Sequence, residues 1–205
     1  MFLYKNLRRI PFLVYFCPVK ESRMKLNKSL ILALTLLILI GSVCRIAGFA
    51  PQIAMAIFGG AVIKDRRLAF ILPLGSMFLS DLLYEVLFRF GYAPYGGIYE
   101  GQLTNYILLA SIVIIGFIAR NLSIQRIIVA TLAGPTLYFL LSNFLLWLNG
   151  GGYQRPKTWS GLIMCYTDAV PFFRSGLINT LIFSAILFGG YFLLQRNLST
   201  KKQLN

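Results

Sequence analysis

The chain has 205 residues, of which 58% are hydrophobic and only 13% are charged. A soluble domain carries about 25% charged residues, so this composition argues against a soluble protein and predicts a surface that faces lipid. The net charge of +14 does not predict nucleic-acid binding, because the basic residues stand between apolar runs rather than on one polar face.

The chain has no histidine, and its three cysteines show no paired spacing. These features argue against the common catalytic triads, zinc sites and His-ligated haem. The sequence also has no phosphate-binding glycine loop. We therefore expect no enzyme, no catalytic residue, no cofactor and no metal site. A reaction of aspartic type by Asp81 and Glu85 is the weaker alternative.

The first 28 residues contain seven Lys and Arg and predict a cytoplasmic segment. A second methionine, Met24, is followed by a basic start of its own, and we hypothesise that translation begins there. The alternative is that the residues before it form an amphipathic segment on the membrane surface.

The apolar runs that follow predict an all-α, polytopic membrane helix bundle in one domain, residues 29–194, with a cytoplasmic tail at 195–205. About six transmembrane helices are expected, at residues 29–47, 52–63, 68–90, 103–119, 126–148 and 171–194.

Two stretches of this bundle are unusual. The run 52–63 reaches only about 18 Å against a hydrocarbon core of about 30 Å, so we expect it to be tilted, shielded by neighbours or only partly spanning. Its small residues Ala56 and Gly60 permit close helix packing. Residues 149–170 are expected to be a polar outer segment with a glycine-rich part that forms a lid. Pro171 is expected to start the last helix.

The basic residues give the topology. With the N-terminus inside, the inner segments contain 15 Lys and Arg and the outer segments contain 5. This bias predicts that both termini face the cytoplasm and that the protein lies in the cell (inner) membrane with an even number of spans.

Ionisable residues inside a membrane are costly and therefore informative. In the third span Asp81, Glu85 and Arg89 are four residues apart and share one helix face. Glu85 before Arg89 is also the favourable order for an ion pair.

Other polar residues lie in the same outer half of their spans, whereas the cytoplasmic halves are almost purely apolar. We predict an outward-facing polar cup. Alternatively, Arg45, Asp81, Glu85 and Arg89 form a structural ion-pair network, or the arginines reach the outer headgroups. An interfacial aromatic belt explains Tyr95, Tyr99 and Trp147 better than a ligand site does. The candidate ligand-binding residues are Arg45, Asp81, Glu85, Asn105, Asn143, Trp147, Asp168 and Asn179.

Four runs carry a resemblance: residues 49–61 (FAPQIAMAIFGGA), 73–81 (PLGSMFLSD), 141–144 (LSNF) with Trp147, and 169–173 (AVPFF). Over about residues 29–194 the chain resembles an uncharacterised bacterial membrane family that is provisionally labelled as transport proteins. In span count and layout it is similar to the substrate-binding S components of energy-coupling-factor vitamin transporters. That similarity implies a small ligand near the outer face, a transmembrane T component and two ATPases as partners.

The sequence thus favours a membrane protein that binds or transports a small, vitamin-like molecule, with lipid as its surroundings and no nucleic acid as partner. A membrane scaffold or assembly protein without a ligand is the alternative.

Overall fold

The computed structural model describes residues 28–150 and 153–203, and within these ranges the chain is helical and contains no strand. The elements are α1 (Lys28–Ile46), α2 (Gln52–Val62), α3 (Arg66–Arg89), α4 (Gln102–Gly116) with a 3-10 turn (Phe117–Ala119), α5 (Ile124–Leu148) and α6 (Trp159–Gln203). The predicted all-α bundle is confirmed. The proposed start at Met24 lies outside the described residues.

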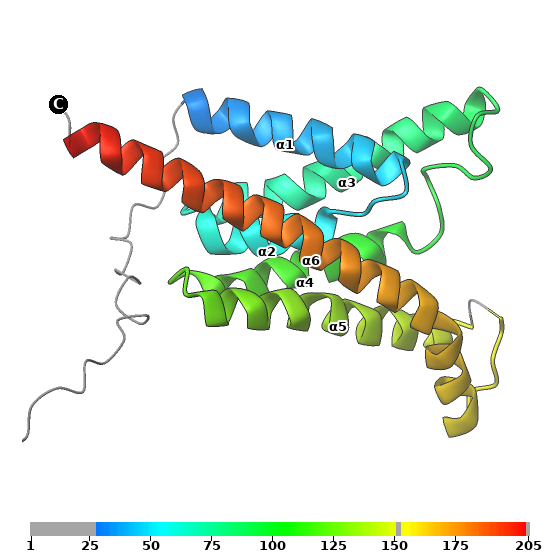
Figure 1. Cartoon of the computed structure of the whole chain (residues 1–205). Helices are drawn as coiled ribbons and strands as arrows, with labels where there is room; N and C mark the ends of the chain where they lie inside the picture. The colour runs from blue at the N-terminus through cyan, green and yellow to red at the C-terminus, as the bar shows by residue number, and fades with distance from the viewer. Residues whose placement is uncertain (1–27, 151–152, 204–205) are drawn as a thin grey trace, which may run out of the picture.

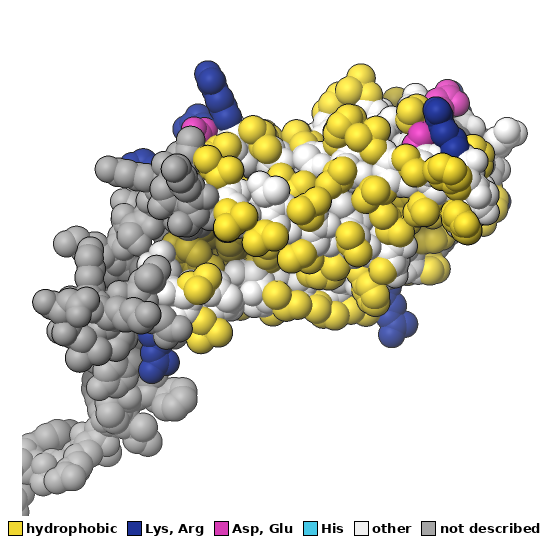
Figure 2. All heavy atoms as spheres, turned by 90° about the horizontal axis from the view of Figure 1, so that it is seen from above, with side chains coloured by type: hydrophobic (Ala, Val, Ile, Leu, Met, Phe, Trp, Pro, Cys, Tyr) yellow, Lys and Arg dark blue, Asp and Glu magenta, His cyan; other side chains and the backbone are white. Residues whose placement is uncertain are grey.

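Four helices are long and apolar enough to cross a membrane, namely α3, α4 with its 3-10 turn, α5 and residues 159–196 of α6. The apolar parts of α1 and α2 are shorter. Large apolar side chains cover the outer surface of the bundle, as Figure 2 shows for one face. Since a soluble protein would bury these groups, this surface fits a lipid environment.

The short helix α2 forms the centre of the packed core. Ten of its eleven residues are buried, and it contacts α3, α4, α5 and α6. Figure 1 shows that the chain folds back after α1, so that α2 occupies only one half of the bundle's length. Of the three expectations for residues 52–63, shielding by neighbouring helices is the one that the burial confirms.

Helices α2 and α4 approach each other so closely that their backbones touch. A Cβ added to Gly60 would lie 3.0 Å from the Gly116 backbone, and one added to Gly116 would lie 3.1 Å from the Ala56 carbonyl oxygen. The predicted close packing at Ala56 and Gly60 is therefore confirmed, and Gly116 of α4 is its counterpart.

The predicted polar segment 149–170 is wrong in its second half, because α6 begins at Trp159 and not at Pro171. The Thr158 hydroxyl accepts a hydrogen bond from the Gly161 amide, and Leu162, Cys165 and Ala169 form a buried stripe at helical spacing. Pro171 lies inside the helix, where it removes one backbone hydrogen bond, and Figure 1 shows α6 bent between its yellow and orange parts.

We expect Gly60→Ala to lower the free energy of unfolding by about 1–3 kcal/mol, because the new methyl group must separate two helix backbones. Thermal unfolding in detergent measures this effect. Gly189→Ala in α6 is the matched control, since a Cβ there meets open space. Equal stability of both variants would contradict the close contact between α2 and α4.

Candidate functional site

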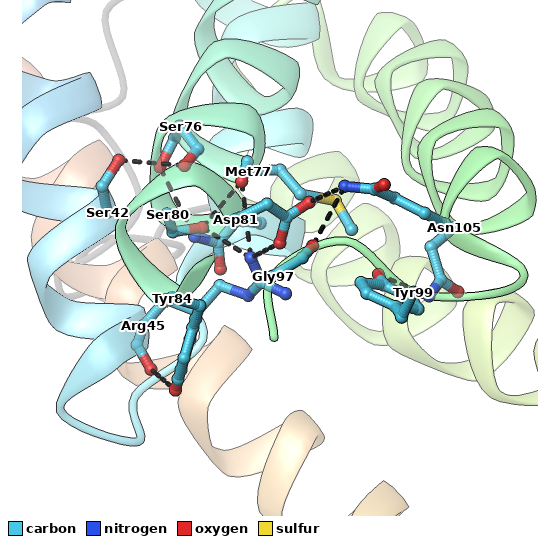
Figure 3. Close-up of polar contacts among 12 residues, drawn as sticks. Ser42, Arg45, Ser76, Met77, Ser80, Asp81, Tyr84, Gly97, Tyr99 and Asn105 are labelled. Carbon is cyan, nitrogen blue, oxygen red and sulfur yellow. Dashed lines mark hydrogen bonds and ion pairs between the residues drawn. The ribbon is translucent and has the colours of Figure 1, made fainter. Parts of the chain in front are cut away.

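The most connected polar group in the bundle is the ion pair between Arg45 at the end of α1 and Asp81 in α3 (Figure 3). The guanidinium Nη1 also donates to the Ser80 hydroxyl and, at 3.4 Å, to the Met77 carbonyl oxygen. The Asp81 side chain is only 3% exposed. A buried carboxylate of this kind requires a partner, and Arg45 supplies it.

The second carboxylate oxygen of Asp81 is held from α4. Gln102 Nε2 donates to it at 2.8 Å, and the Tyr106 hydroxyl donates to it at 2.7 Å. Both carboxylate oxygens are thus bonded, and the network connects α1, α3 and α4. This arrangement stabilises the packing of three helices around one negative charge.

The remaining two nitrogens of the Arg45 guanidinium, Nε and Nη2, make no hydrogen bond within the described part of the chain. The guanidinium carbon lies 5.7 Å from the ring centre of Tyr84, whose hydroxyl donates to the Arg45 carbonyl oxygen at 3.3 Å. One edge of the guanidinium is therefore fixed by protein groups, and the other edge remains available.

Residues 91–101, which connect α3 to α4, lie against this ion pair. Gly97 packs so closely on the Asp81 carbonyl group that a Cβ would overlap it. The Glu85 carboxylate accepts a weak hydrogen bond from the Ile98 amide at 3.4 Å, and the Tyr95 ring stacks on Tyr84 at 5.5 Å. Glycine is required at residue 97 because no side chain fits there.

A cavity of about 350 Å³ lies beside the ion pair, at the end of the bundle where α1 and α3 finish and α4 begins. This volume is at the lower end of the range for small-molecule sites. Its lining combines one charged pair, aromatic rings and backbone: Arg45, Asp81, Tyr84, Tyr95, Gly96, Gly97 and Tyr99.

Two of the eight predicted site residues, Arg45 and Asp81, line this cavity. Glu85 is beside it and forms the predicted ion pair with Arg89 at 2.9 Å. Asn105 contacts the site through its amide, which donates to the Tyr99 hydroxyl at 2.9 Å and accepts from the Tyr138 hydroxyl at 3.2 Å. These four residues gather at one end of the bundle.

The other four lie elsewhere. Asn143 and Asp168 line a separate cavity of about 200 Å³ between α5 and α6, where Asp168 pairs with Arg155. Trp147 donates its indole N–H to the Pro156 carbonyl oxygen at 3.0 Å. Asn179 lies further along α6 and is absent from the lining of both cavities.

A third cavity, of about 660 Å³, separates the ends of α4 and α5 and includes Asn105 and Ser142 in its lining. The ionisable residue among its lining groups is Glu100, which is exposed to solvent. This larger space lacks a buried charge that would fix the orientation of a ligand.

Sequence reasoning missed Gln102, Tyr106, Tyr84 and Ser80 as members of the site. A partial signal was present for two of them, because Ser80 adjoins Asp81 and Tyr84 follows it by three residues on the same helix. Gln102 and Tyr106 stand four residues apart at the start of α4, but their common partner is 20 or more positions away in the chain. Only the folded structure brings them to Asp81.

Within the described residues, no group of three or more Cys, Asp or Glu side chains is placed to hold a metal ion. The bundle, with its apolar surface and four helices of membrane-crossing length, defines an integral membrane protein. Residues 24–203 match the family described as "Family of unknown function (DUF6580)", and the chain belongs to that family. No curated protein and no solved structure matches the chain.

We expect Asp81→Asn to lower the free energy of unfolding by about 3 kcal/mol, because it leaves the Arg45 guanidinium partly buried without its counter-charge. Chemical or thermal denaturation in detergent measures the loss. Glu85→Gln, one turn along the same helix, is the control and should cost clearly less, since its partner Arg89 is mostly exposed. Equal losses of stability in the two variants would show that the Arg45–Asp81 pair contributes no more to stability than the exposed Glu85–Arg89 pair.

Proposed function

We propose that this protein binds a small, vitamin-sized molecule at the outer end of the bundle and serves in its transport, in the manner of the substrate-binding S components. The observation that carries the proposal is the cavity beside Arg45, where a half-buried guanidinium offers two unbonded N–H-bearing nitrogens. A donor of that kind, held in place by a second charge, is a usual means of orienting a ligand.

The cavity's construction supports binding rather than catalysis. Its two charged groups are paired with each other, and Asp81 accepts hydrogen bonds at both oxygens, so it is poorly placed to take a proton from a substrate. Helices α1 and α3, which carry Arg45 and Asp81, pack along each other. We therefore propose a binding protein without enzymatic activity.

We further propose that the protein lies in the cell (inner) membrane with both termini in the cytoplasm and the cavity opening to the outside. Three exposed basic residues stand where α2 ends and α3 begins: Lys64 in the connection and Arg66 and Arg67 in the first turn of α3. This junction lies at the end of the bundle opposite to the cavity (Figure 1). This distribution agrees with the preference of basic residues for the cytoplasmic side.

The orientation is tested by single cysteines in a chain whose three native cysteines are replaced by serine. A cysteine at Tyr95 should react with a membrane-impermeant maleimide in intact cells, whereas one at Lys64 should react only after the membrane is opened. The reverse pattern would invert the proposed topology.

A T component and two ATPases are the proposed partners for transport. The surface available for them is the lipid-facing side of α1, which exposes Leu32, Leu36 and Val43. Copurification of such proteins with the tagged chain is the direct test of this part of the proposal.

One observation favours a second candidate, a membrane scaffold or assembly protein. The Arg45–Asp81 network satisfies every oxygen of the carboxylate from within the chain, and structural ion pairs share this property. In that case the cavity is a packing gap, and the pair serves only to join α1, α3 and α4.

The double variant Arg45→Met with Asp81→Leu separates the two candidates. Replacing both members of a buried ion pair by apolar residues is often close to neutral for stability. We expect the double variant to fold. Its thermal stability should no longer increase with any compound of a broad panel of neutral, cationic and anionic small molecules, and cells that contain it should take up none of them. The pair Arg155→Met with Asp168→Leu is the matched control and should retain binding. Failure of the unmodified protein to bind any compound would support the scaffold.

A further inference from the structure

We infer that the ligand of this cavity is a small planar carboxylate, bound by the Nε and Nη2 edge of Arg45. This inference rests on the proposed function and adds the chemical class of the ligand. It depends on which atoms of the cavity still have hydrogen-bonding capacity.

The guanidinium of Arg45 has its two halves in different surroundings. Nη1 is committed to Asp81, Ser80 and Met77, whereas Nε and Nη2 have no partner in the described residues. Nε and Nη2 together form the edge of arginine whose two parallel N–H groups match the two oxygens of a carboxylate. The pairing with Asp81 thus fixes the orientation of the guanidinium and leaves this edge open.

One further polar group of the lining, the Tyr99 hydroxyl, offers a donor. The Tyr99 hydroxyl oxygen accepts from Asn105, which leaves its own proton to donate. The carboxylate of the lining is already used, because the Asp81 oxygens are bonded to Arg45, Gln102 and Tyr106. The Gly97 carbonyl oxygen also accepts from Gln102. A ligand that supplies acceptors fits this set, and a cationic ligand finds no open counter-charge.

The aromatic and glycine residues of the lining favour a ligand whose carboxylate is attached to a flat, apolar group. Tyr84 and Tyr95 are stacked, Tyr99 adds a third ring, and Gly96 and Gly97 add backbone without side chains. Aromatic rings bordering a space without side chains accept a planar group through stacked or edge contacts. The volume of about 350 Å³ limits the ligand to a single small ring system.

The test uses four probes of similar size: benzoate, benzamide, benzylamine and cyclohexanecarboxylate. Their binding to the full-length protein in nanodiscs of uncharged lipid is measured by calorimetry and by thermal unfolding. We expect benzoate to bind at least about tenfold more tightly than benzamide, because a carboxylate offers two charged oxygens to the guanidinium edge whereas an amide offers one uncharged oxygen. Benzylamine should not bind, and cyclohexanecarboxylate should bind more weakly than benzoate.

Arg45→Lys keeps a positive charge for Asp81 but removes the two-nitrogen edge, so it should abolish the preference of benzoate over benzamide. Arg174→Lys, at an exposed arginine of α6, is the matched control. Tyr95→Leu should abolish the preference of benzoate over cyclohexanecarboxylate. Tyr92→Leu, at an exposed tyrosine of the same connection, should leave it unchanged.

Benzamide or benzylamine binding as well as benzoate would overturn the carboxylate inference while leaving a small-molecule site in place. The comparison of acid, amide and amine in the unmodified protein decides this even if Arg45→Lys does not fold. If none of the four probes binds while a compound without a carboxylate from the broad panel does, the inference is likewise overturned. If nothing binds at all, both the inference and the proposed function fail.

Discussion

The end of the bundle where α1 and α3 finish depends on one electrostatic contact, the ion pair between Arg45 and Asp81. A carboxylate that is 3% exposed among helices is strongly unfavourable unless its charge is balanced and its oxygens are bonded. The chain meets this requirement with Arg45 of α1 and with Gln102 and Tyr106 of α4. Ser80, beside Asp81 on α3, accepts a hydrogen bond from Arg45 and so helps to hold the guanidinium in place. Removing any one of these elements would leave polar atoms without partners.

The two halves of the bundle are stabilised in different ways. In the half occupied by α2, the core is apolar and includes Ile57, Leu72 and Ile112, and backbones touch at Gly60 and Gly116. Dispersion contacts and shape complementarity dominate there. At the other end, polar networks and the connection at residues 91–101 take the place of a packed helix. A polar cavity can exist at that end because the packed half already holds the helices together.

Much of this fold follows from the apolar pattern of the sequence. Helices α1 to α5 begin and end within about two residues of the predicted runs, apart from the 3-10 turn at the end of α4, because long uncharged stretches have few alternatives in lipid. The first part of α6 was missed, since the glycine-rich start and Asp168 made residues 149–170 look like a polar loop and Pro171 looked like a helix start. The buried stripe of Leu162, Cys165 and Ala169 was the periodic signal that polarity obscured.

The site was predictable only in part. The burial cost of an intramembrane charge identified Arg45 and Asp81, and helical spacing identified the pair of Glu85 with Arg89. Spacing within one helix says nothing about which helices are neighbours, so Asn143 and Asp168 were assigned to the same cup although they lie at a different cavity. For the same reason the sequence did not predict that Gln102 and Tyr106 contact Asp81.

The half-length of α2 has a geometric consequence for the whole molecule. Figure 1 shows α2 beside only one half of the bundle, and its C-terminal end is next to the basic residues at the start of α3, so this helix is missing from the half that contains the cavity. Gln52, the first residue of α2, donates to the Ser76 hydroxyl, so α2 begins between one and two turns of α3 before Asp81. Lengthening α2 by two turns at this end would bring helix backbone to the level of the ion pair and its cavity.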